Sequence, residues 1–180
     1  MATSSSPEIS TASGRTPPPL PAAGPAVHDF DFLFGTWHVH HRRLTERLVG
    51  SDVWDEFDGS MTAWPILNGA GNIDDNVVEK PDGIYRAISL RTYDPATDRW
   101  SIWWLDGRSP SRLDPPVVGG FEDPGHGTFL GLDTFDGRPI VVRYLWTIHS
   151  RDAIRWEQAF SADEGASWET NWIMESTRVS

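Results

Sequence analysis

Hydrophobic and polar residues alternate along most of the chain beyond residue 28, in short runs that end at glycine, proline, asparagine or aspartate. A period of two is typical of β-strands with one buried face, and closely spaced runs of this kind are typical of an antiparallel barrel or sandwich. The pattern predicts an all-β domain of about ten strands, with helical character confined to a short turn at Asp29–Phe34. The expected strands are Thr36–Leu48, Asp52–Ala63, Asn72–Glu79, Ile84–Tyr93, Trp100–Asp106, Val117–Phe121, His126–Asp133, Arg138–His149, Ala153–Ser161 and Trp168–Val179.

Two segments fall outside this alternation. Residues 1–27 consist mainly of Ser, Thr, Pro, Gly and Ala and hold almost no large apolar side chain. Such a segment buries too little surface to offset the entropy of ordering, so we expect a disordered tail before a single domain at residues 28–180. Residues 107–116 contain three prolines between two expected strands, which predicts an irregular lid or rim.

The step from the helical turn into the first strand is Gly35-Thr36-Trp37. Glycine permits the tight backbone bend at this step, and the Trp37 ring is large enough to close one end of a barrel. Arg178 lies on the last expected strand, at the far end of the chain. We expect its guanidinium to lie across Trp37 in a cation–π contact that joins the first and last strands.

These features resemble the lipocalin and calycin β-barrels, in which a first-strand Gly-x-Trp accompanies a late basic residue. More specifically, residues 29–179 are similar to an uncharacterised bacterial family with a lipocalin-like fold. Its patterns are DFLxGTW, present at Asp31–Trp37, and RWEQAFSxDxGxxWExNW, present at Arg155–Trp172. The resemblance implies a single antiparallel lipocalin-like barrel. It implies no particular activity, because the family has none that is agreed.

Composition excludes several function classes. The chain has no cysteine, which excludes disulfides, a thiol nucleophile and thiolate metal sites. Its formal net charge of −11 argues against a nucleic-acid partner, because an acidic surface repels phosphate. No long apolar run and no signal-like N-terminus are visible, so we expect no membrane partner and a cytoplasmic location. A homodimer formed by edge pairing of two barrels stays open.

The chain has ten tryptophans, more than are needed to pack the core of a domain of this size. Alternation places several of them on one face of their strands, which predicts a tryptophan-lined cavity for an apolar or aromatic small molecule. The residues expected to bind this ligand are Trp37, Trp54, Trp104, Trp156, Gln158 and Trp172.

His41 and Arg43 share the face of Trp37 and are expected to point inward. A buried charge is costly unless it is paired. Arg43 therefore predicts either a buried carboxylate partner, with Glu56 as first candidate, or a polar or anionic group on the ligand. His41 titrates near neutrality and is a candidate general base, and Glu56 or Tyr144 would be its proton partner.

Three functions are compatible with these residues. The first is small-molecule binding, with the polar or anionic end of the ligand near His41 and Arg43. The second is a cofactor-free cyclase or isomerase that uses His41, Arg43, Glu56 and Tyr144 as catalytic groups. The third is a metal-dependent cupin-like enzyme, which requires His38 and His40 to point inward, whereas alternation places both outside.

We expect no cofactor and no metal. The glycine-spaced first-strand motif of the haem-binding nitrobindins is missing after Trp37, although His126 and His149 are available as axial ligands in principle. Nucleotide-binding glycine loops and the G-x-S-x-G elbow are also missing from the sequence.

Overall fold

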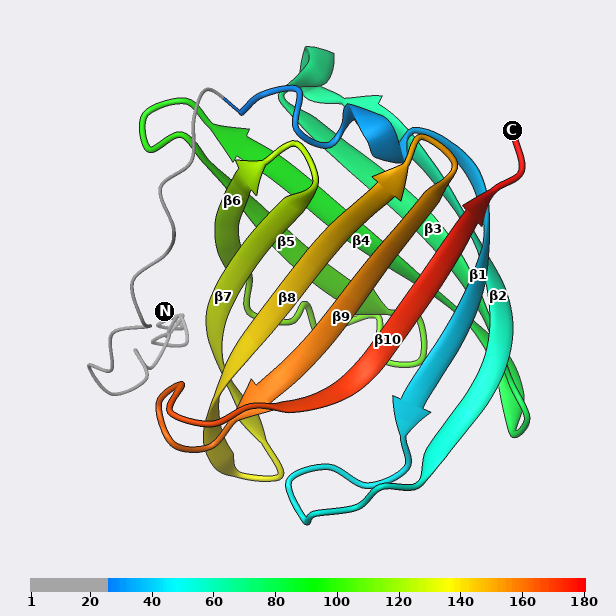
Figure 1. Cartoon of the computed structure of the whole chain (residues 1–180), viewed down its shortest axis with the longest axis vertical. Helices are drawn as coiled ribbons and strands as arrows, with labels where there is room; N and C mark the ends of the chain where they lie inside the picture. The colour runs from blue at the N-terminus through cyan, green and yellow to red at the C-terminus, as the bar shows by residue number, and fades with distance from the viewer. Residues whose placement is uncertain (1–25) are drawn as a thin grey trace, which may run out of the picture.

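The computed structural model describes residues 26–180, which form a closed barrel of ten antiparallel strands (Figure 1). Each strand pairs with its neighbours in the chain, and the first pairs with the last to close the ring. The predicted all-β, lipocalin-like barrel is thereby confirmed. The strands are β1 (Gly35–Leu44), β2 (Trp54–Ile66), β3 (Gly71–Lys80), β4 (Gly83–Asp94), β5 (Arg99–Asp106), β6 (Val117–Asp123), β7 (His126–Phe135), β8 (Arg138–Ser150), β9 (Ala153–Ser161) and β10 (Glu169–Arg178).

Several element boundaries differ from the prediction. β1 ends at Leu44 instead of Leu48, and Leu48 has a positive φ of 59° that does not fit a strand. Ala26, which the sequence places in the tail, is buried and accepts a hydrogen bond from Trp100 Nε1 at 2.7 Å. The rest of the predicted disordered tail lies outside the described residues. Between residues 26 and 180, no helix has both the length and the apolar character needed to cross a membrane.

One end of the barrel is closed by the 3₁₀ turn η1 (Asp31–Leu33), which lies where β1 begins (Figure 1). Phe30, Leu33 and Trp37 are fully buried at this end. Trp37 Nε1 donates a hydrogen bond to the Leu33 carbonyl oxygen at 2.8 Å, which fixes the turn on the indole. A second 3₁₀ turn, η2 (Leu67–Gly69), connects β2 to β3. The closed end is thus filled by apolar side chains from the turn and the first strand.

Arg178, the last residue of β10, holds this end together. Its Cζ lies 4.1 Å from the Trp37 ring centroid, which confirms the predicted contact between the first and last strands. Its Nη1 and Nη2 donate hydrogen bonds to the carbonyl oxygens of Phe34 and Phe32, both at 2.6 Å. Gly35 has a φ of +121°, and a Cβ there would meet Arg178 Nη1 at 2.8 Å, so this bend requires glycine.

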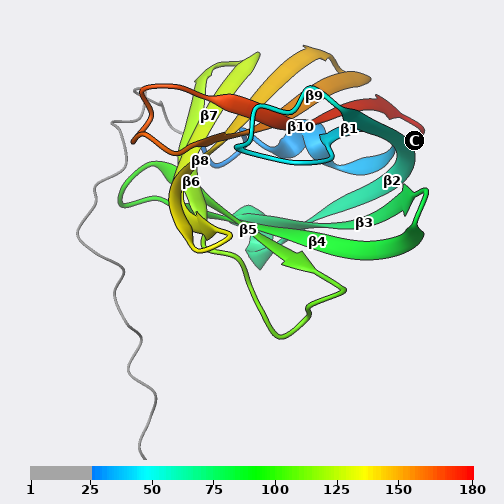
Figure 2. The same cartoon turned by 90° about the horizontal axis from the view of Figure 1, so that it is seen from below.

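The barrel interior has two chemically different walls. Figure 2 shows β3 and β4 on one side of the interior and β9 and β10 on the other. The inner positions of β3 and β4 are largely polar, and they include Asn72, Asp74, Asn76, Ser89 and Arg91. The inner positions of β8, β9 and β10 carry aromatic side chains, among them Trp146, Trp156, Phe160 and Trp172. A molecule inside the barrel would therefore lie between a polar and an aromatic surface.

We predict that Arg178→Ala lowers the free energy of unfolding by about 2–4 kcal/mol, because it removes two charge-assisted hydrogen bonds and a cation–π contact. Arg178→Lys should recover little of this, since an ammonium group cannot lie flat on Trp37 and also reach two carbonyl oxygens. Urea denaturation followed by tryptophan fluorescence measures the loss.

Arg86→Ala is the matched control for this experiment. Arg86 forms an exposed ion pair with Asp75 on the outer surface, and such pairs contribute at most about 1 kcal/mol. Equal losses in Arg178→Ala and Arg86→Ala would contradict the role assigned to Arg178.

Candidate ligand cavity

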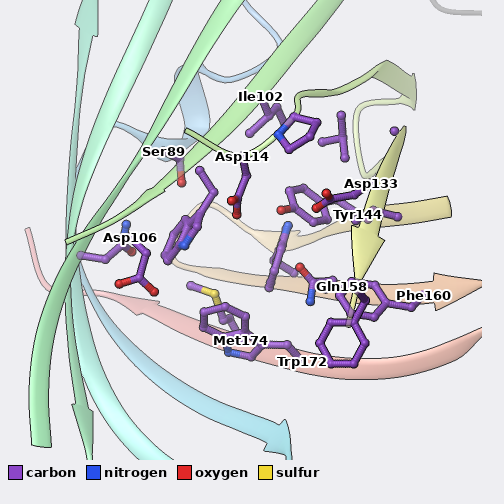
Figure 3. Close-up of a pocket in the computed structure, with 18 of the residues that line it drawn as sticks. Ser89, Ile102, Asp106, Asp114, Asp133, Tyr144, Gln158, Phe160, Trp172 and Met174 are labelled. Atoms are coloured by element: carbon purple, nitrogen blue, oxygen red, sulfur yellow. The ribbon is translucent and has the colours of Figure 1, made fainter. Parts of the chain in front are cut away.

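A cavity of about 380 Å³ lies inside the barrel (Figure 3). Its lining reaches Arg47 and the loop at residues 107–116, at the end opposite η1, where it opens. Pockets for small molecules usually measure about 300–1,000 Å³, so the space fits a ligand of modest size. The irregular loop at residues 107–116, between β5 and β6, contributes Arg108, Arg112 and Asp114 to the lining. The predicted rim at this segment is therefore present and lines the cavity.

Aromatic rings in edge-to-face contact form one side of the cavity. Trp172 is the centre of this group, with Trp104 at 5.7 Å and Trp156 at 5.6 Å between ring centroids, both at interplanar angles of 84°. Tyr144 packs on Trp156 at 4.8 Å. Edge-to-face packing holds these rings in place, so the aromatic side is a preformed surface.

Arg43 and Arg47 line the cavity toward its open end. The Arg43 Cζ lies 4.3 Å from the Trp172 ring centroid, and its Nε has no hydrogen-bond partner. The Arg47 Cζ lies 5.7 Å from the centroid of Phe135 and 5.9 Å from that of Phe160. Burial lowers the pKa of both guanidinium groups, and for Arg47 the nearby Arg43 adds to the effect and brings the pKa to about 10. Neither arginine forms an ion pair with a carboxylate among residues 26–180.

The opposite side of the opening is acidic. Burial, and then repulsion from Asp133, raises the pKa of Asp114. Burial also raises the pKa of the Tyr144 hydroxyl, and the Asp114 and Asp133 carboxylates add to that shift. Figure 3 shows these three side chains directed into the same part of the cavity. Arg108, by contrast, is paired with Asp106 at 2.6 Å.

The polar wall is a buried network on β3 and β4. Asp74 and Arg91 form an ion pair at 2.7 Å, and their side chains are 1% and 3% exposed. Asp74 Oδ1 also accepts hydrogen bonds from Asn76 Nδ2 at 2.5 Å and from the Ser89 backbone N–H at 2.9 Å. Arg91 Nη1 donates to Asn72 Oδ1 at 3.0 Å. The sequence-based prediction missed this network. The sequence feature that could have indicated it is the polar residue at every second position, 72, 74 and 76. These positions share one face of β3 and pair with residues 91, 89 and 87 of β4.

His41 points inward as predicted, but it does not line the cavity. Its Nδ1 accepts a hydrogen bond from Trp172 Nε1 at 3.2 Å, and its ring stacks on Phe57 at 4.9 Å. The side chain is buried, and burial, followed by the charges of His40 and Arg43, lowers its pKa to about 3. His41 is therefore neutral at physiological pH. It positions the Trp172 indole through this hydrogen bond, without lining the cavity itself.

The predicted pairing of Arg43 with Glu56 is wrong. Arg43 lies opposite Asp55 in the β1–β2 register, so alternation directs Trp54 and Glu56 to the outer surface. There Glu56 accepts a hydrogen bond from Arg42 Nε at 3.1 Å. The Arg42 guanidinium also lies 5.2 Å from the ring centroid of Trp54. Trp54 and Glu56 flank Asp55 on β2, so their side chains point to the opposite face of the strand, away from the interior.

The remaining predicted residues divide into two groups. Trp37 belongs to the closed end, under Arg178. The predicted residues that line the cavity are Arg43, Trp104, Tyr144, Trp156, Gln158 and Trp172. The structure therefore brings six of the ten candidate residues to one space, and their roles there stay predictions.

The histidines considered for a metal or haem lie on the outer surface. The side chains of His38 and His40 are 58% and 41% exposed, and His40 Nδ1 contacts Asp58 Oδ1 at 3.0 Å. The inward pair that a cupin-like enzyme requires is therefore not formed. His126 and His149 are also exposed. In the part of the chain that the structure describes, no group of three or more His, Asp or Glu side chains is arranged to hold a metal ion.

Fold and cavity together define a closed ten-stranded antiparallel barrel with an internal cavity. Among solved structures, the chain is similar to the S-type phycobiliprotein lyase CPES from Guillardia theta. The TM-score is 0.56, with 10% sequence identity over 86% of this chain and 93% of that chain. At this identity the likeness shows a shared fold. No family model and no curated protein matches the chain, so the resemblance to the uncharacterised bacterial family stays a prediction.

We predict that His41 makes the barrel acid-sensitive. The folded pKa of about 3 lies below the ordinary value of 6.5, so the unfolded chain takes up a proton first as the pH falls. Stability is unaffected above about pH 6.5 and decreases below it, by about 2 kcal/mol between pH 7 and pH 5.

His41→Gln tests this because glutamine keeps an acceptor for Trp172 Nε1 and does not titrate. Urea unfolding at pH 7 and pH 5 should show a loss about 2 kcal/mol smaller in this variant than in the wild type. His149→Gln, at an exposed position, is the control. The same pH dependence in the wild type and His41→Gln would show that His41 is not the acid-sensitive group.

Proposed function

We propose that the protein binds a small aromatic molecule that carries an anionic group, with its rings on the tryptophan wall and its anion at Arg43 and Arg47. The observation that carries this proposal is the state of the two guanidinium groups. Both are half-buried at the cavity, lie on aromatic rings and have no carboxylate ion-pair partner within residues 26–180. A guanidinium offers hydrogen-bond donors alone, in a planar fork that matches a carboxylate. An anionic ligand would supply the missing partner.

The size and shape of the space support the same function. Barrels of this width enclose ligand cavities, and the fold shared with a phycobiliprotein lyase is consistent with small-molecule binding. The aromatic side gives a flat ligand a large contact area without a need for rearrangement. Gln158 and Tyr144 add neutral polar groups between the rings.

The cofactor-free enzyme has less support. It requires His41, Arg43 and a proton partner, either Glu56 or Tyr144, around one open space, and the lining includes Arg43 and Tyr144 but not His41. The Nδ1 lone pair of His41 is already engaged with Trp172. A general base must reach the proton that it abstracts. Binding is therefore the better-supported function, and the cytoplasmic location and homodimer stay predictions.

We predict that biphenyl-4-carboxylate quenches the tryptophan fluorescence on binding, and that the neutral biphenyl-4-methanol binds about 10-fold more weakly because it forms no charge-assisted hydrogen bonds. Arg43→Met and Arg47→Met should each remove most of this preference, since methionine keeps an apolar side chain without the donors. Fluorescence titration and calorimetry measure the affinities.

Arg151→Met is the matched control, because Arg151 is exposed in the turn between β8 and β9 at the closed end. It should bind both compounds as the wild type does. The proposal fails if the carboxylate does not bind, or if the acid and the alcohol bind equally well.

A further inference from the structure

The buried network on β3 and β4 belongs to the cavity and not to the closed core alone. Asp74, Asn76, Ser89 and Arg91 all line the space. Arg91 marks the inner end of this wall, because its Cζ lies 5.3 Å from the ring centroid of Phe30 beneath η1. The wall therefore presents polar atoms to the part of the cavity that lies farther from the opening than Arg43 and Arg47 do.

The hydrogen bonds of the network determine which atoms remain free. A carboxylate accepts hydrogen bonds, so the contact with Asp74 orients the Asn76 amide with its nitrogen toward Asp74. That nitrogen also donates to the Ala87 carbonyl oxygen at 3.4 Å. The Asn76 carbonyl oxygen and the Ser89 hydroxyl form no hydrogen bond with any residue between 26 and 180, and Figure 3 shows Ser89 directed into the cavity. Two oxygens are thus available to a ligand.

Gln158 adds an acceptor from the aromatic side by the same reasoning. Asn171 Nδ2 donates to the Glu169 carbonyl oxygen at 3.4 Å, which leaves Asn171 Oδ1 as an acceptor. Gln158 Nε2 donates to that oxygen at 2.8 Å. The Gln158 amide nitrogen is therefore engaged in the wall, and its carbonyl oxygen is left for the cavity.

A network that served the fold alone would not need these free oxygens. Replacing a buried ion pair by apolar residues is often neutral or stabilising, and a large cluster of apolar side chains packs elsewhere in the interior. Buried polar atoms without partners are rare and call for an explanation. Besides the free oxygens, Arg91 Nε has no partner although its side chain is 3% exposed.

We propose that this polar wall selects ligands that carry a hydrogen-bond donor, a hydroxyl or N–H group, at the end opposite their anionic group. The inference rests on the proposed function and specifies its ligand class. Arginine donors face the ligand near the opening, the oxygens of Asn76 and Ser89 face it from the β3–β4 wall, and the Gln158 oxygen faces it from the aromatic side. The cavity thereby selects both the chemical groups of the ligand and the orientation in which it binds.

The test compares three compounds that differ at one position: biphenyl-4-carboxylate, its 4′-hydroxy derivative and its 4′-methoxy derivative. The hydroxyl group supplies a hydrogen-bond donor, whereas the methoxy group places an oxygen at the same ring position without an O–H to donate. Wild-type protein should bind the hydroxy compound about 5- to 10-fold more tightly than the parent, the effect of one well-made hydrogen bond. The methoxy compound should bind no better than the parent.

Ser89→Ala removes one free oxygen with little change in volume and should reduce the hydroxyl preference to about 2-fold or less. Ser60→Ala is the matched control, since Ser60 lies on the outer face of β2. It should keep the full preference. Thermal unfolding of both variants verifies that each is folded.

The outcomes separate the two proposals. If the three compounds bind equally well, the wall does not select a donor, and the proposed function still stands. If the preference is unchanged in Ser89→Ala, the donor is not bound by Ser89 and the role assigned to Ser89 is wrong. If the parent carboxylate does not bind, the proposed function fails and this inference fails with it.

Discussion

The closure of β1 against β10 is the constraint on which the rest of the structure depends. Once the ring is closed, each strand has one inner and one outer face, and alternation divides the side chains between them. Arg178 fixes the closure at one end, where it covers Trp37 and donates hydrogen bonds to the carbonyl oxygens of Phe32 and Phe34. That end is filled by apolar side chains, so the space for a ligand opens at the other.

Alternation and turn residues are local signals, so the pattern was sufficient to predict about ten strands in a barrel or sandwich. The single closed barrel was predicted from the resemblance to lipocalin-like barrels that the Gly35–Trp37 step and Arg178 carry. The alternation also placed Trp104, Trp156 and Trp172 correctly on inner faces. It failed for Glu56 because the second strand carries polar and aromatic residues on both faces, so its orientation depends on its register with β1. It missed the polar wall because Ile73 and Val77 suggest an opposite inner face, and the partners of Asp74 lie on another strand.

The two sets of buried charges have different energetic consequences. The charges of Asp74 and Arg91 compensate each other, and hydrogen bonds link this pair to Asn76, Ser89 and Asn72. Arg43 and Arg47 have aromatic contacts, and no carboxylate among residues 26–180 forms an ion pair with either of them. Their desolvation is a cost that the anionic group of the proposed ligand would offset.

The charge of the whole chain affects how such a ligand arrives. A net charge of −11 repels an anion at long range, but this repulsion is screened beyond about 8–10 Å at physiological salt. Within that distance the nearby charges have the larger effect, and Arg43 and Arg47 line the cavity without an ion-pair partner among residues 26–180. Asp114 and Asp133 face them across the same opening. An anion is therefore attracted to one side of the opening and repelled from the other, which directs its charged end toward β1 and its opposite end toward the polar wall.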